Sequence, residues 1–489
     1  MADLWIEESM LIDGKLQPAA SGKTFENVNP ATEEVVGVAA DGGAEDMDRA
    51  IAAARRAFDE TSWSTDVRLR VKCLRQLQQA LLNHADEFKR TLVTEVGTPI
   101  LLTNMAQYDT PVRGIGWVAD LAERYEWDED LGVLEVIPGM PARRFALREP
   151  VGVVGAITPW NYPVQINLAK AAPALAAGNT VVLKPAPDTP WSALLLGKLI
   201  AEETDIPDGV FNVVTSSDHL VGEQLAKDPR VDMVSFTGST KTGRRIMEVG
   251  APTIKKVFLE LGGKSALIVL DDADLATGVG AAAFQVTSHA GQGCAITSRC
   301  LVPKDKFDEA TEIAKATLES IPVGDPFDEG TMMGPLISKR QLDRVLGYIR
   351  TGIDEGATVV TGGRQPESQP KGYYVEPTLL VGVDNSARVA REEIFGPVLV
   401  MLPYDGVDEA VAIANDSEYG LSGAVYAGTD ERALEVARQL RTGTVSINGG
   451  MWYGPDVPFG GYRQSGVGRE SGVQGFEEYL EIKAVARPA

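Results

Sequence analysis

The alternation of strand-like and helix-like segments that begins at Val151 is the feature that most constrains the fold. A short apolar run at 153–158 precedes a helical stretch at 163–178, and a β-rich run at 180–185 precedes a second helical stretch at 190–203. The same alternation continues to residue 238. Repeated strand–helix units of this size predict a parallel, doubly wound sheet in an α/β fold.

The alternation resumes beyond residue 259 with a different spacing, so we expect a second α/β domain. The segments at 265–270 and 274–290 are typical of a strand and a helix, and further strands and helices are expected up to residue 443. A chain of 489 residues is long enough to bury a core in each of at least two domains.

Two extended segments stand apart from this pattern. Residues 131–150 are typical of a hairpin with its turn at 138–141, and the tail at 475–488 ends in alternating residues. Exposed strand edges of this kind pair readily with a strand of another chain. We expect both segments to support association between subunits, with the alternative that each lies on its own subunit.

The net charge of −23 indicates which partners to exclude. A field of this sign repels phosphate backbones and anionic membranes, so we expect no nucleic-acid and no membrane partner. The first ten residues are acidic and lack an apolar centre, and no apolar stretch is long enough to span a bilayer. We therefore expect a cytoplasmic protein without a signal peptide.

The cysteine content points to the same compartment. Only Cys73, Cys294 and Cys300 are present, and an odd, sparse set argues against a disulfide framework. The three cysteines and three histidines show no spacing typical of a metal site, so no metal is expected. Cys300 is interpreted as a buried structural thiol.

Cys294 and Glu260 are the candidate nucleophile and base. Cys294 follows Gly291 and Gly293, and the missing side chains at these glycines leave room for a substrate carbon to approach the sulfur. Glu260 lies between two leucines, so partial desolvation favours it as a base that takes a proton from water. A nucleophile and a base are the minimum for covalent acyl transfer. Each residue alone is also compatible with a structural role.

A cofactor site is indicated by a glycine and a serine after a strand. No GxGxxG pattern follows a strand, but Gly238 and Ser239 precede an expected helix. Backbone N–H groups at a helix start bind a pyrophosphate well. The same two residues also fit a simple helix N-cap.

Six motifs occur in one order over nearly the whole chain, namely PWNYP, VSFTGST, ELGGKS, GQGCAITSR, EEIFGPV and PFGGYRQSG. Together they resemble the aldehyde dehydrogenase superfamily. The resemblance implies a Rossmann-like cofactor domain, a second α/β catalytic domain and a small β oligomerisation arm. It implies the boundaries 1–130 and 149–258 for the cofactor domain, 259–441 for the catalytic domain, 131–148 and 468–489 for the arm and tail, and 442–467 for an active-site and interface segment.

The implied reaction is NAD(P)-dependent oxidation of an aldehyde to a carboxylic acid. Cys294 would add to the carbonyl carbon, and loss of hydride to the nicotinamide would leave a thioester. Glu260 would then activate water, and Asn161 would stabilise the oxyanion. Lys170 and Glu470 match the family's proton relay, although a solvated lysine and a surface carboxylate are the alternatives.

The resemblance also implies the residues around NAD. They are Trp160, Lys184, Pro187, Gly222, Gly238, Ser239, Leu261, Glu393 and Phe395. Many NAD-preferring members carry a glutamate where this chain has Pro187, so one source of repulsion against a 2′-phosphate is missing. No arginine appears nearby to attract that phosphate. We therefore favour NAD and leave NADP open.

The matching substrate positions are mostly apolar or aromatic, namely Tyr162, Ile166, Ala169, Met451, Tyr453 and Phe459. Such a pocket suits an apolar aldehyde of medium-chain, aromatic or terpenoid type. Ala169 replaces a large aromatic of some relatives, which widens the expected tunnel. The absence of an arginine argues against semialdehydes with a second carboxylate. The alternative is that these residues are simply core.

We expect a homodimer or homotetramer that acts on a small-molecule aldehyde. Two other functions remain open, an oxidoreductase that passes the acyl group to another acceptor and a non-catalytic binding protein on the same fold. The base at Glu260 favours water as the acceptor, because hydrolysis requires deprotonation of water.

Overall fold

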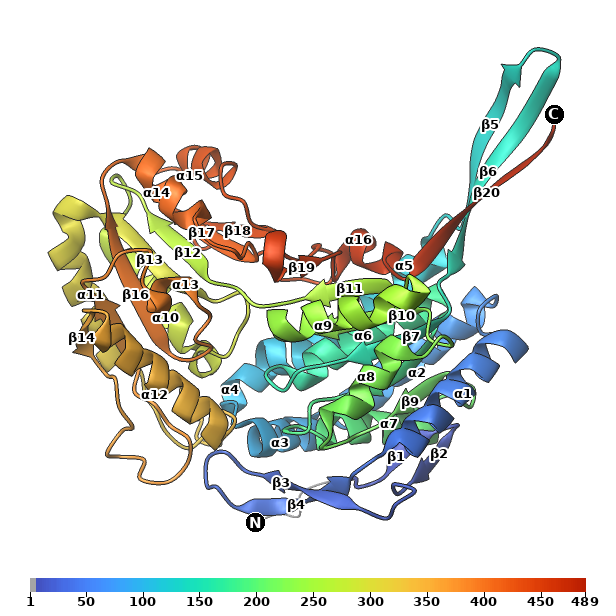
Figure 1. The fold of residues 1–489 in the computed structure, drawn as a ribbon, viewed down its shortest axis with the longest axis horizontal. Helices are drawn as coiled ribbons and strands as arrows, with labels where there is room; N and C mark the ends of the chain where they lie inside the picture. The colour runs from blue at the N-terminus through green and yellow to red at the C-terminus, as the bar shows by residue number, and fades with distance from the viewer. Residues whose placement is uncertain (1–5) are drawn as a thin grey trace.

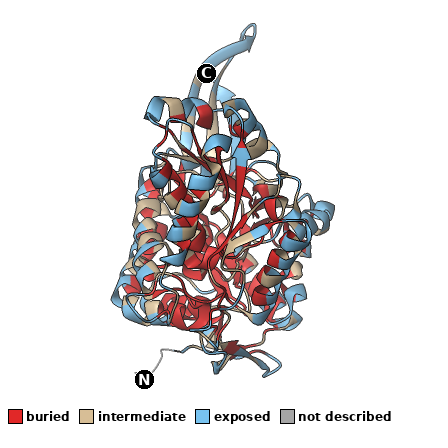
Figure 2. Cartoon of the chain, turned by 90° about the vertical axis from the view of Figure 1, so that its left-hand side faces the viewer, coloured by how far each residue is buried: buried red, intermediate tan, exposed pale blue. Residues whose placement is uncertain are grey.

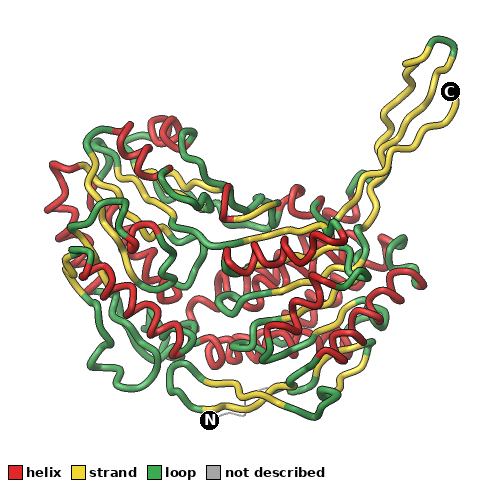
Figure 3. The backbone as a smooth tube through the Cα atoms, viewed as in Figure 1, coloured by secondary structure: helices red, strands yellow, loops and turns green. Residues whose placement is uncertain are grey.

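The computed structural model describes residues 6–489, so the first five residues of the acidic N-terminal stretch lie outside it. Two α/β units, each built around one large sheet, lie side by side, and a long β arm projects from one of them (Figure 1). Helices flank both sheets, and loops join the layers (Figure 3). This arrangement confirms the expected α/β class with two sheets and an arm.

The first sheet has six strands in the order β19-β11-β10-β7-β8-β9. Its strands are β7 (Val153–Ile157), β8 (Thr180–Lys184), β9 (Phe211–Val213), β10 (Met233–Thr237), β11 (Lys256–Glu260) and β19 (Gly466–Val467). All pairs are parallel except β11 with β19. The chain winds outward from β7 to β9 and then returns to place β10 on the other side of β7, which creates a switch point between β7 and β10.

Helices cover both faces of this sheet, because its strands are apolar on both sides. One face packs against α1 (Ala44–Glu60), α8 (His219–Lys227) and α9 (Thr240–Gly250). The other packs against α6 (Pro163–Ala177) and α7 (Trp191–Glu203), which α2 (Val67–Asn83), α3 (Ala85–Val96) and α5 (Asp109–Arg124) cover in turn. The short α4 (Ile100–Leu102) lies between α3 and α5. Two hairpins precede α1: β1 (Met10–Ile12) pairs with β2 (Lys15–Gln17), and β3 (Thr24–Val28) pairs with β4 (Val35–Ala40).

The second sheet has seven strands in the order β14-β15-β16-β13-β12-β17-β18, of which only the β14 pair is antiparallel. Its strands are β12 (Ser265–Val269), β13 (Thr297–Pro303), β14 (Thr358–Thr361), β15 (Thr378–Val381), β16 (Val398–Tyr404), β17 (Ser422–Tyr426) and β18 (Thr444–Ile447). Its helices are α10 (Leu275–Thr287), α11 (Phe307–Glu319), α12 (Lys339–Asp354), α13 (Arg388–Arg391), α14 (Val407–Asn415) and α15 (Asp430–Ala437).

Successive side chains of β12 pack into apolar cores on opposite faces of this sheet. Ala266 and Ile268 join one apolar cluster, whereas Leu267 and Val269 join another on the opposite face. Successive side chains of a strand point to opposite faces, so one strand contributes to two cores. Buried residues are concentrated in the sheets and the inner faces of their helices (Figure 2).

The arm is a three-stranded antiparallel sheet in the order β20-β6-β5. Its strands are β5 (Asp128–Ile137), β6 (Met140–Pro150) and β20 (Leu480–Pro488), the last preceded by α16 (Gly472–Glu477). The expected hairpin turn lies between β5 and β6. Apolar residues of the arm are exposed, including Val136 at 74% and Ile482 at 68%. In the described part of the chain, no helix is both long and apolar enough to cross a bilayer.

Candidate active site

The switch point of the first sheet places several expected cofactor residues at one edge. Trp160 and Asn161 follow β7, and Gly238 and Ser239 follow β10. In open α/β sheets, ligands bind outside the carboxyl ends of the strands at such a point. Topology alone therefore brings these residues to a ligand-binding edge.

Ser239 is the N-cap of α9, and its Oγ accepts a hydrogen bond from the Thr242 N–H at 3.2 Å. Ser239 can therefore cap the helix and still belong to a pyrophosphate site, because a capped helix start presents further free N–H groups. Gly238 lies where a Cβ would come within 2.5 Å of the Phe236 ring, so a larger residue does not fit. Leu261 packs against the first turn of α9, since a Cβ on Gly243 would lie 2.7 Å from its Cδ2.

Lys184 ends β8 and is buried. Its Nζ donates to the Pro185 carbonyl at 3.0 Å, and burial lowers the pKa of this amine to about 8. A Cβ on Gly222 would lie 2.8 Å from the Lys184 Cδ, so glycine at 222 makes room for the lysine stem. Pro187 lies in the partly buried turn after the lysine.

Trp160 and Phe395 face each other edge to face, with ring centroids 5.4 Å apart. Phe395 adopts a left-handed φ of 63°, an unusual conformation for a bulky residue. Glu393 accepts a hydrogen bond from the Gly263 N–H at 3.0 Å, and burial raises the pKa of its carboxyl. The two units of the molecule therefore meet at the expected nicotinamide end of the site.

Cys294 is a free, partly buried thiol in the loop before β13. Burial raises the pKa of this thiol, and the nearby Glu260, Glu393 and Glu470 raise the same pKa further. The resting sulfur is therefore protonated and requires a base before it attacks a carbonyl. The structure thus brings the expected nucleophile within electrostatic reach of the expected base.

Gly291, three residues before this cysteine, has a role that the sequence did not indicate. Gly291 has a φ of 73°, and a Cβ there would lie 2.1 Å from the Gly396 carbonyl oxygen. Gly291 therefore allows two backbone segments to pack closely, rather than leaving a path to the sulfur. Gly293 is less constrained, because a Cβ would meet side chains rather than backbone, namely Ile296 at 2.8 Å and the Tyr162 ring at 3.9 Å.

Asn161 is buried, and its Nδ2 donates to the Gln292 carbonyl at 2.8 Å. The backbone carbonyl of Asn161 accepts a hydrogen bond from the Gln107 Nε2 at 2.9 Å. An amide carries two N–H donors, so one donor remains for a substrate oxygen. The expected oxyanion donor is thus fixed from both its side chain and its backbone.

Gln292 and His289 are residues of the site that sequence reasoning missed. The Gln292 Nε2 donates to the His289 carbonyl at 3.1 Å, and its Oε1 accepts from the Ile337 N–H at 2.9 Å. The buried His289 ring packs edge to face on Tyr162 at 5.2 Å, and burial lowers the pKa of this imidazole to about 4. A glutamine between two glycines was the only signal in the sequence.

Glu260 ends β11 and is 1% exposed, more buried than the sequence predicted. Neither of its carboxylate oxygens has a hydrogen-bond partner among the described residues, 6–489. Burial raises the pKa of this carboxyl well above its usual value, and the neighbouring Glu470 raises it further. A buried, unpartnered carboxylate with a raised pKa is suited to accept a proton.

Lys170 and Glu470 form a buried ion pair close to Glu260. The Lys170 Nζ lies 3.1 Å from the Glu470 Oε1, and the ammonium also lies over the Phe258 ring at 4.7 Å. The Lys170 charge lowers the pKa of Glu260, and the Glu470 charge raises it. Residues separated by 300 positions along the chain therefore meet at one carboxylate.

The expected substrate residues are only partly brought together. Tyr162, Ala169, Tyr453 and Phe459 are partly buried, and Ile166 is buried. Trp452, which the sequence analysis did not include, stacks on Phe459 with ring centroids 5.3 Å apart. Met451 is 79% exposed and does not form a buried wall in the single chain.

No group of three or more His, Cys, Asp or Glu side chains within residues 6–489 is arranged to hold a metal ion. Cys73 and Cys300 are buried free thiols away from this chemistry, and burial raises the pKa of Cys300 to about 12. The arrangement therefore supplies a thiol, a buried base, an amide donor and a cofactor edge.

Residues 17–485 match the model of the aldehyde dehydrogenase family. A 3-succinoylsemialdehyde-pyridine dehydrogenase from a Pseudomonas species is 45% identical over 482 residues, which cover 97% of each chain.

Two solved structures resemble the whole chain. Betaine aldehyde dehydrogenase from Staphylococcus aureus in complex with NAD+ has a TM-score of 0.95 at 36% identity and covers 99% of this chain and 95% of its own. A mutant of aldehyde dehydrogenase C from Pseudomonas syringae, in complex with NAD+ and octanal, has a TM-score of 0.94 at 40% identity and covers 99% of this chain and 98% of its own.

Proposed function

The chain belongs to the aldehyde dehydrogenase family, and on this premise we propose that it oxidises an aldehyde to a carboxylic acid with NAD as hydride acceptor and water as acyl acceptor. Cys294 is the nucleophile and Glu260 is the base. The observation that carries the proposal is the buried Glu260 carboxylate, which has no hydrogen-bond partner among residues 6–489 and raises the pKa of the Cys294 thiol. A protein that only binds a ligand would gain nothing from a buried carboxylate without a partner, because burial of such a group destabilises the fold.

The first half of the reaction attaches the substrate to Cys294. The thiol proton passes to Glu260, and the sulfur adds to the carbonyl carbon while the C=O electron pair moves to oxygen. Asn161 Nδ2 and the Cys294 backbone N–H donate hydrogen bonds to this oxyanion. Bound NAD would supply the hydride acceptor. Loss of hydride from the former aldehyde carbon re-forms the carbonyl and leaves a thioester on Cys294.

The second half releases the acid. Glu260, deprotonated again, takes a proton from water as the water oxygen attacks the thioester carbon. The C–S bond then breaks, the sulfur regains a proton, and the carboxylic acid leaves. The Lys170–Glu470 pair offers the exit for the proton, because it adjoins Glu260 electrostatically.

The cofactor edge supports NAD. Gly238 and Ser239 at the start of α9 would hold the pyrophosphate, Lys184 would hold the adenosine ribose, and Glu393 would hold the nicotinamide ribose. The carboxylate that would repel a 2′-phosphate is replaced by Pro187. NAD is the proposal because two similar structures hold NAD+.

The substrate is proposed to be an aldehyde with an apolar or aromatic body. Tyr162, Tyr453, Phe459 and Trp452 offer aromatic surface beside the thiol loop. Octanal is bound by the related aldehyde dehydrogenase C, and the Pseudomonas relative is named for a pyridine-bearing semialdehyde. Both aldehydes have a bulky body, which agrees with a pocket that accepts a large side chain on the aldehyde carbon.

Steady-state reduction of NAD and of NADP, measured without coenzyme A, tests the proposal. Octanal, benzaldehyde, betaine aldehyde and a pyridine-bearing semialdehyde form the panel. Turnover with NAD and octanal or an aromatic aldehyde is the expected result. Turnover that requires coenzyme A or phosphate would replace water as the acceptor, and no turnover with either cofactor would overturn the proposal.

A further inference from the structure

The loop that carries the oxyanion donor has little backbone support of its own. It runs from the end of β7 to the start of α6, and within residues 6–489 no backbone–backbone hydrogen bond involves Pro159, Trp160 or Asn161. A catalytic donor must be held within about 0.5 Å of its working position. The position of Asn161 therefore depends on side-chain contacts with other segments.

Gln107 holds this loop by its backbone. The Gln107 Nε2 donates to the Asn161 carbonyl at 2.9 Å, and the Asn161 Nδ2 donates to the Gln292 carbonyl at 2.8 Å. Gln107 is 0% exposed and Asn161 is 3% exposed, so bulk water does not compete for these bonds. The loop is thus tied to one segment through the Asn161 backbone and to the cysteine loop through the Asn161 side chain.

The segment that carries Gln107 is itself well supported. Gln107 ends a π-helical turn at Thr103–Gln107, in which Met105 leaves the helical conformation with φ −131° and ψ −120°. The next residue, Tyr108, is buried, and its hydroxyl donates to the Leu81 carbonyl at 2.6 Å, which fixes the turn on α2. π-Helical turns are rare and are frequently found at functional sites.

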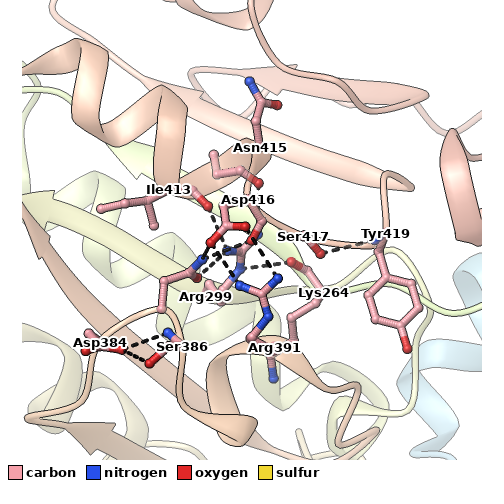
Figure 4. Close-up of polar contacts among 12 residues, drawn as sticks. Lys264, Arg299, Asp384, Ser386, Arg391, Ile413, Asn415, Asp416, Ser417 and Tyr419 are labelled. Carbon is pink, nitrogen blue, oxygen red and sulfur yellow. Dashed lines mark hydrogen bonds and ion pairs between the residues drawn. The ribbon is translucent and has the colours of Figure 1, made fainter.

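The Gln107 amide differs from a buried polar group with a purely structural role. Arg299 is a group of that kind, because its guanidinium donates to three backbone carbonyls and to the Asn385 side chain and so joins several segments (Figure 4). Gln107 makes one hydrogen bond, and its Oε1 has no partner among residues 6–489. A buried acceptor without a partner destabilises the fold, which offsets what the one bond contributes.

We propose that Gln107 is a positioning residue that holds the Asn161 backbone, so that the second N–H of the Asn161 side chain stays available to the oxyanion formed on Cys294. The inference rests on the proposed function, because the oxyanion forms only when Cys294 adds to a carbonyl. Gln107 acts through Asn161 and is not a catalytic residue. Without its hydrogen bond the loop can shift, and a displacement of about 1 Å lowers a rate by about 100-fold.

Gln107→Met tests this role, because methionine keeps the length of the side chain and removes the donor. For the aldehyde that the wild type oxidises fastest, kcat/KM should fall by about 10–100-fold. The Kd of NAD, measured by calorimetry, should not change. The Tm should stay within about 2 °C of the wild type, because the lost bond is offset by removal of the unpartnered Oε1. Gln79→Met, at an exposed position of α2, is the matched control and should behave like the wild type.

A trifluoromethyl ketone reports on the oxyanion without turnover. In heptyl trifluoromethyl ketone, the Cys294 sulfur bonds to the carbonyl carbon, the C=O electron pair moves to oxygen and the thiol proton passes to Glu260. The resulting carbon has no hydrogen to lose as hydride, so the adduct accumulates. Its Ki should rise in Gln107→Met by about the factor by which kcat/KM falls.

A double variant separates positioning from a structural role. Asn161→Ala alone should lower kcat/KM by about 100–1,000-fold, and Gln107→Met added to it should cause no further loss, because the amide to be positioned is gone. Losses that multiply in the double variant, a Gln107→Met protein that unfolds or no longer binds NAD, or one that matches the wild type in kcat/KM and Ki would each overturn the proposal. A wild type that neither oxidises an aldehyde nor binds the ketone would overturn the proposed function and this inference with it.

Discussion

The chemistry at residue scale depends on one carboxylate that is buried without a partner. Glu260 is separated from water, yet its ionised form is needed twice in the proposed reaction. Lys170 favours that form by lowering the pKa of Glu260, whereas burial and Glu470 oppose it. The net effect is a raised pKa for Glu260, so the carboxylate binds a proton more readily than an exposed glutamate does.

Glu260→Gln should separate the two halves of the reaction. Attachment of the aldehyde and hydride loss should slow as well, because the thiol proton must then pass to water, but they are needed only once per enzyme for a burst. Water attack on the thioester should slow more, by about 100-fold or more, since general-base assistance contributes about that much. Stopped-flow absorbance should record a burst of NADH followed by a slow steady state. Glu202→Gln, on the exposed end of α7, is the control and should show wild-type rates. A variant with a full steady-state rate would remove Glu260 from the mechanism.

The same carboxylate predicts the pH dependence of hydrolysis. Because the pKa of Glu260 is raised, its basic form accumulates only as the pH rises through that raised pKa. The wild-type rate of thioester hydrolysis should therefore rise with pH, and the residual rate of Glu260→Gln should lose this rise. Single-turnover product release across a pH series measures it. An identical pH profile in both proteins would assign the titration to another group.

His289 carries a pH-dependent share of stability. Its folded pKa of about 4 lies below its usual 6.5, so the unfolded state binds more protons between these values. The stability from its neutral form is complete above pH 6.5 and is lost as the pH falls toward 4, by about 3 kcal/mol in total. His289→Phe should flatten the dependence of unfolding free energy on pH in this window, measured by urea titration. His219→Phe is the control, because its side chain is 91% exposed. Equal slopes for wild type and His289→Phe would refute the linkage.

At the scale of elements, the site depends on close packing between the cysteine loop and the loop before β16. Gly291→Ala should be costly, because it combines a φ of 73° with a Cβ 2.1 Å from the Gly396 carbonyl. We expect a loss of more than about 1 kcal/mol in unfolding free energy and a fall in kcat. Gly280→Ala, inside α10 and 4.0 Å from its nearest neighbour, should be neutral or stabilising. Calorimetry of both variants measures the difference, and equal Tm values would contradict the packing role.

The sequence predicted elements where local pattern was decisive. The runs that became β7, α6, β8 and α7 were apparent because apolar residues, Pro190 and Gly178 mark their limits. The helix expected to continue to residue 290 ends at Thr287, because His289 and Ala290 take left-handed conformations. Such conformations in residues other than glycine are set by tertiary packing and leave no local signal.

The site itself divides in the same way. The sequence neighbours of Cys294 and Glu260 indicated a nucleophile and a base, but only resemblance to a family favoured those roles over structural ones. Lys170 and Glu470 required the resemblance altogether, since 300 residues separate them. Gln292, Gln107 and Trp452 were missed because their roles come from contacts across elements rather than from spacing. The confirmed family and fold therefore came from motif order, whereas the supporting contacts came only from the structure.

At the scale of the whole molecule, the arm is the feature that a single chain leaves unexplained. Its three strands expose apolar side chains to solvent on a projecting sheet (Figure 1). Exposed apolar surface and open strand edges favour association, so a homodimer or homotetramer remains our prediction.

Charges placed on the arm should weaken that association. Val136→Glu combined with Ile482→Glu puts two carboxylates on residues that are 74% and 68% exposed, so the single fold should tolerate them. Burial of these charges at a subunit contact would be unfavourable, and light scattering after size-exclusion chromatography should record a smaller mass. Val35→Glu, on β4 and 52% exposed, is the matched control and should keep the wild-type mass. A wild-type monomer, or an unchanged mass in the double variant with normal folding, would show that the arm does not hold subunits together. A smaller species that still binds NAD but unfolds at a lower Tm would indicate that the arm stabilises the assembly, whereas the cofactor edge is complete within each subunit.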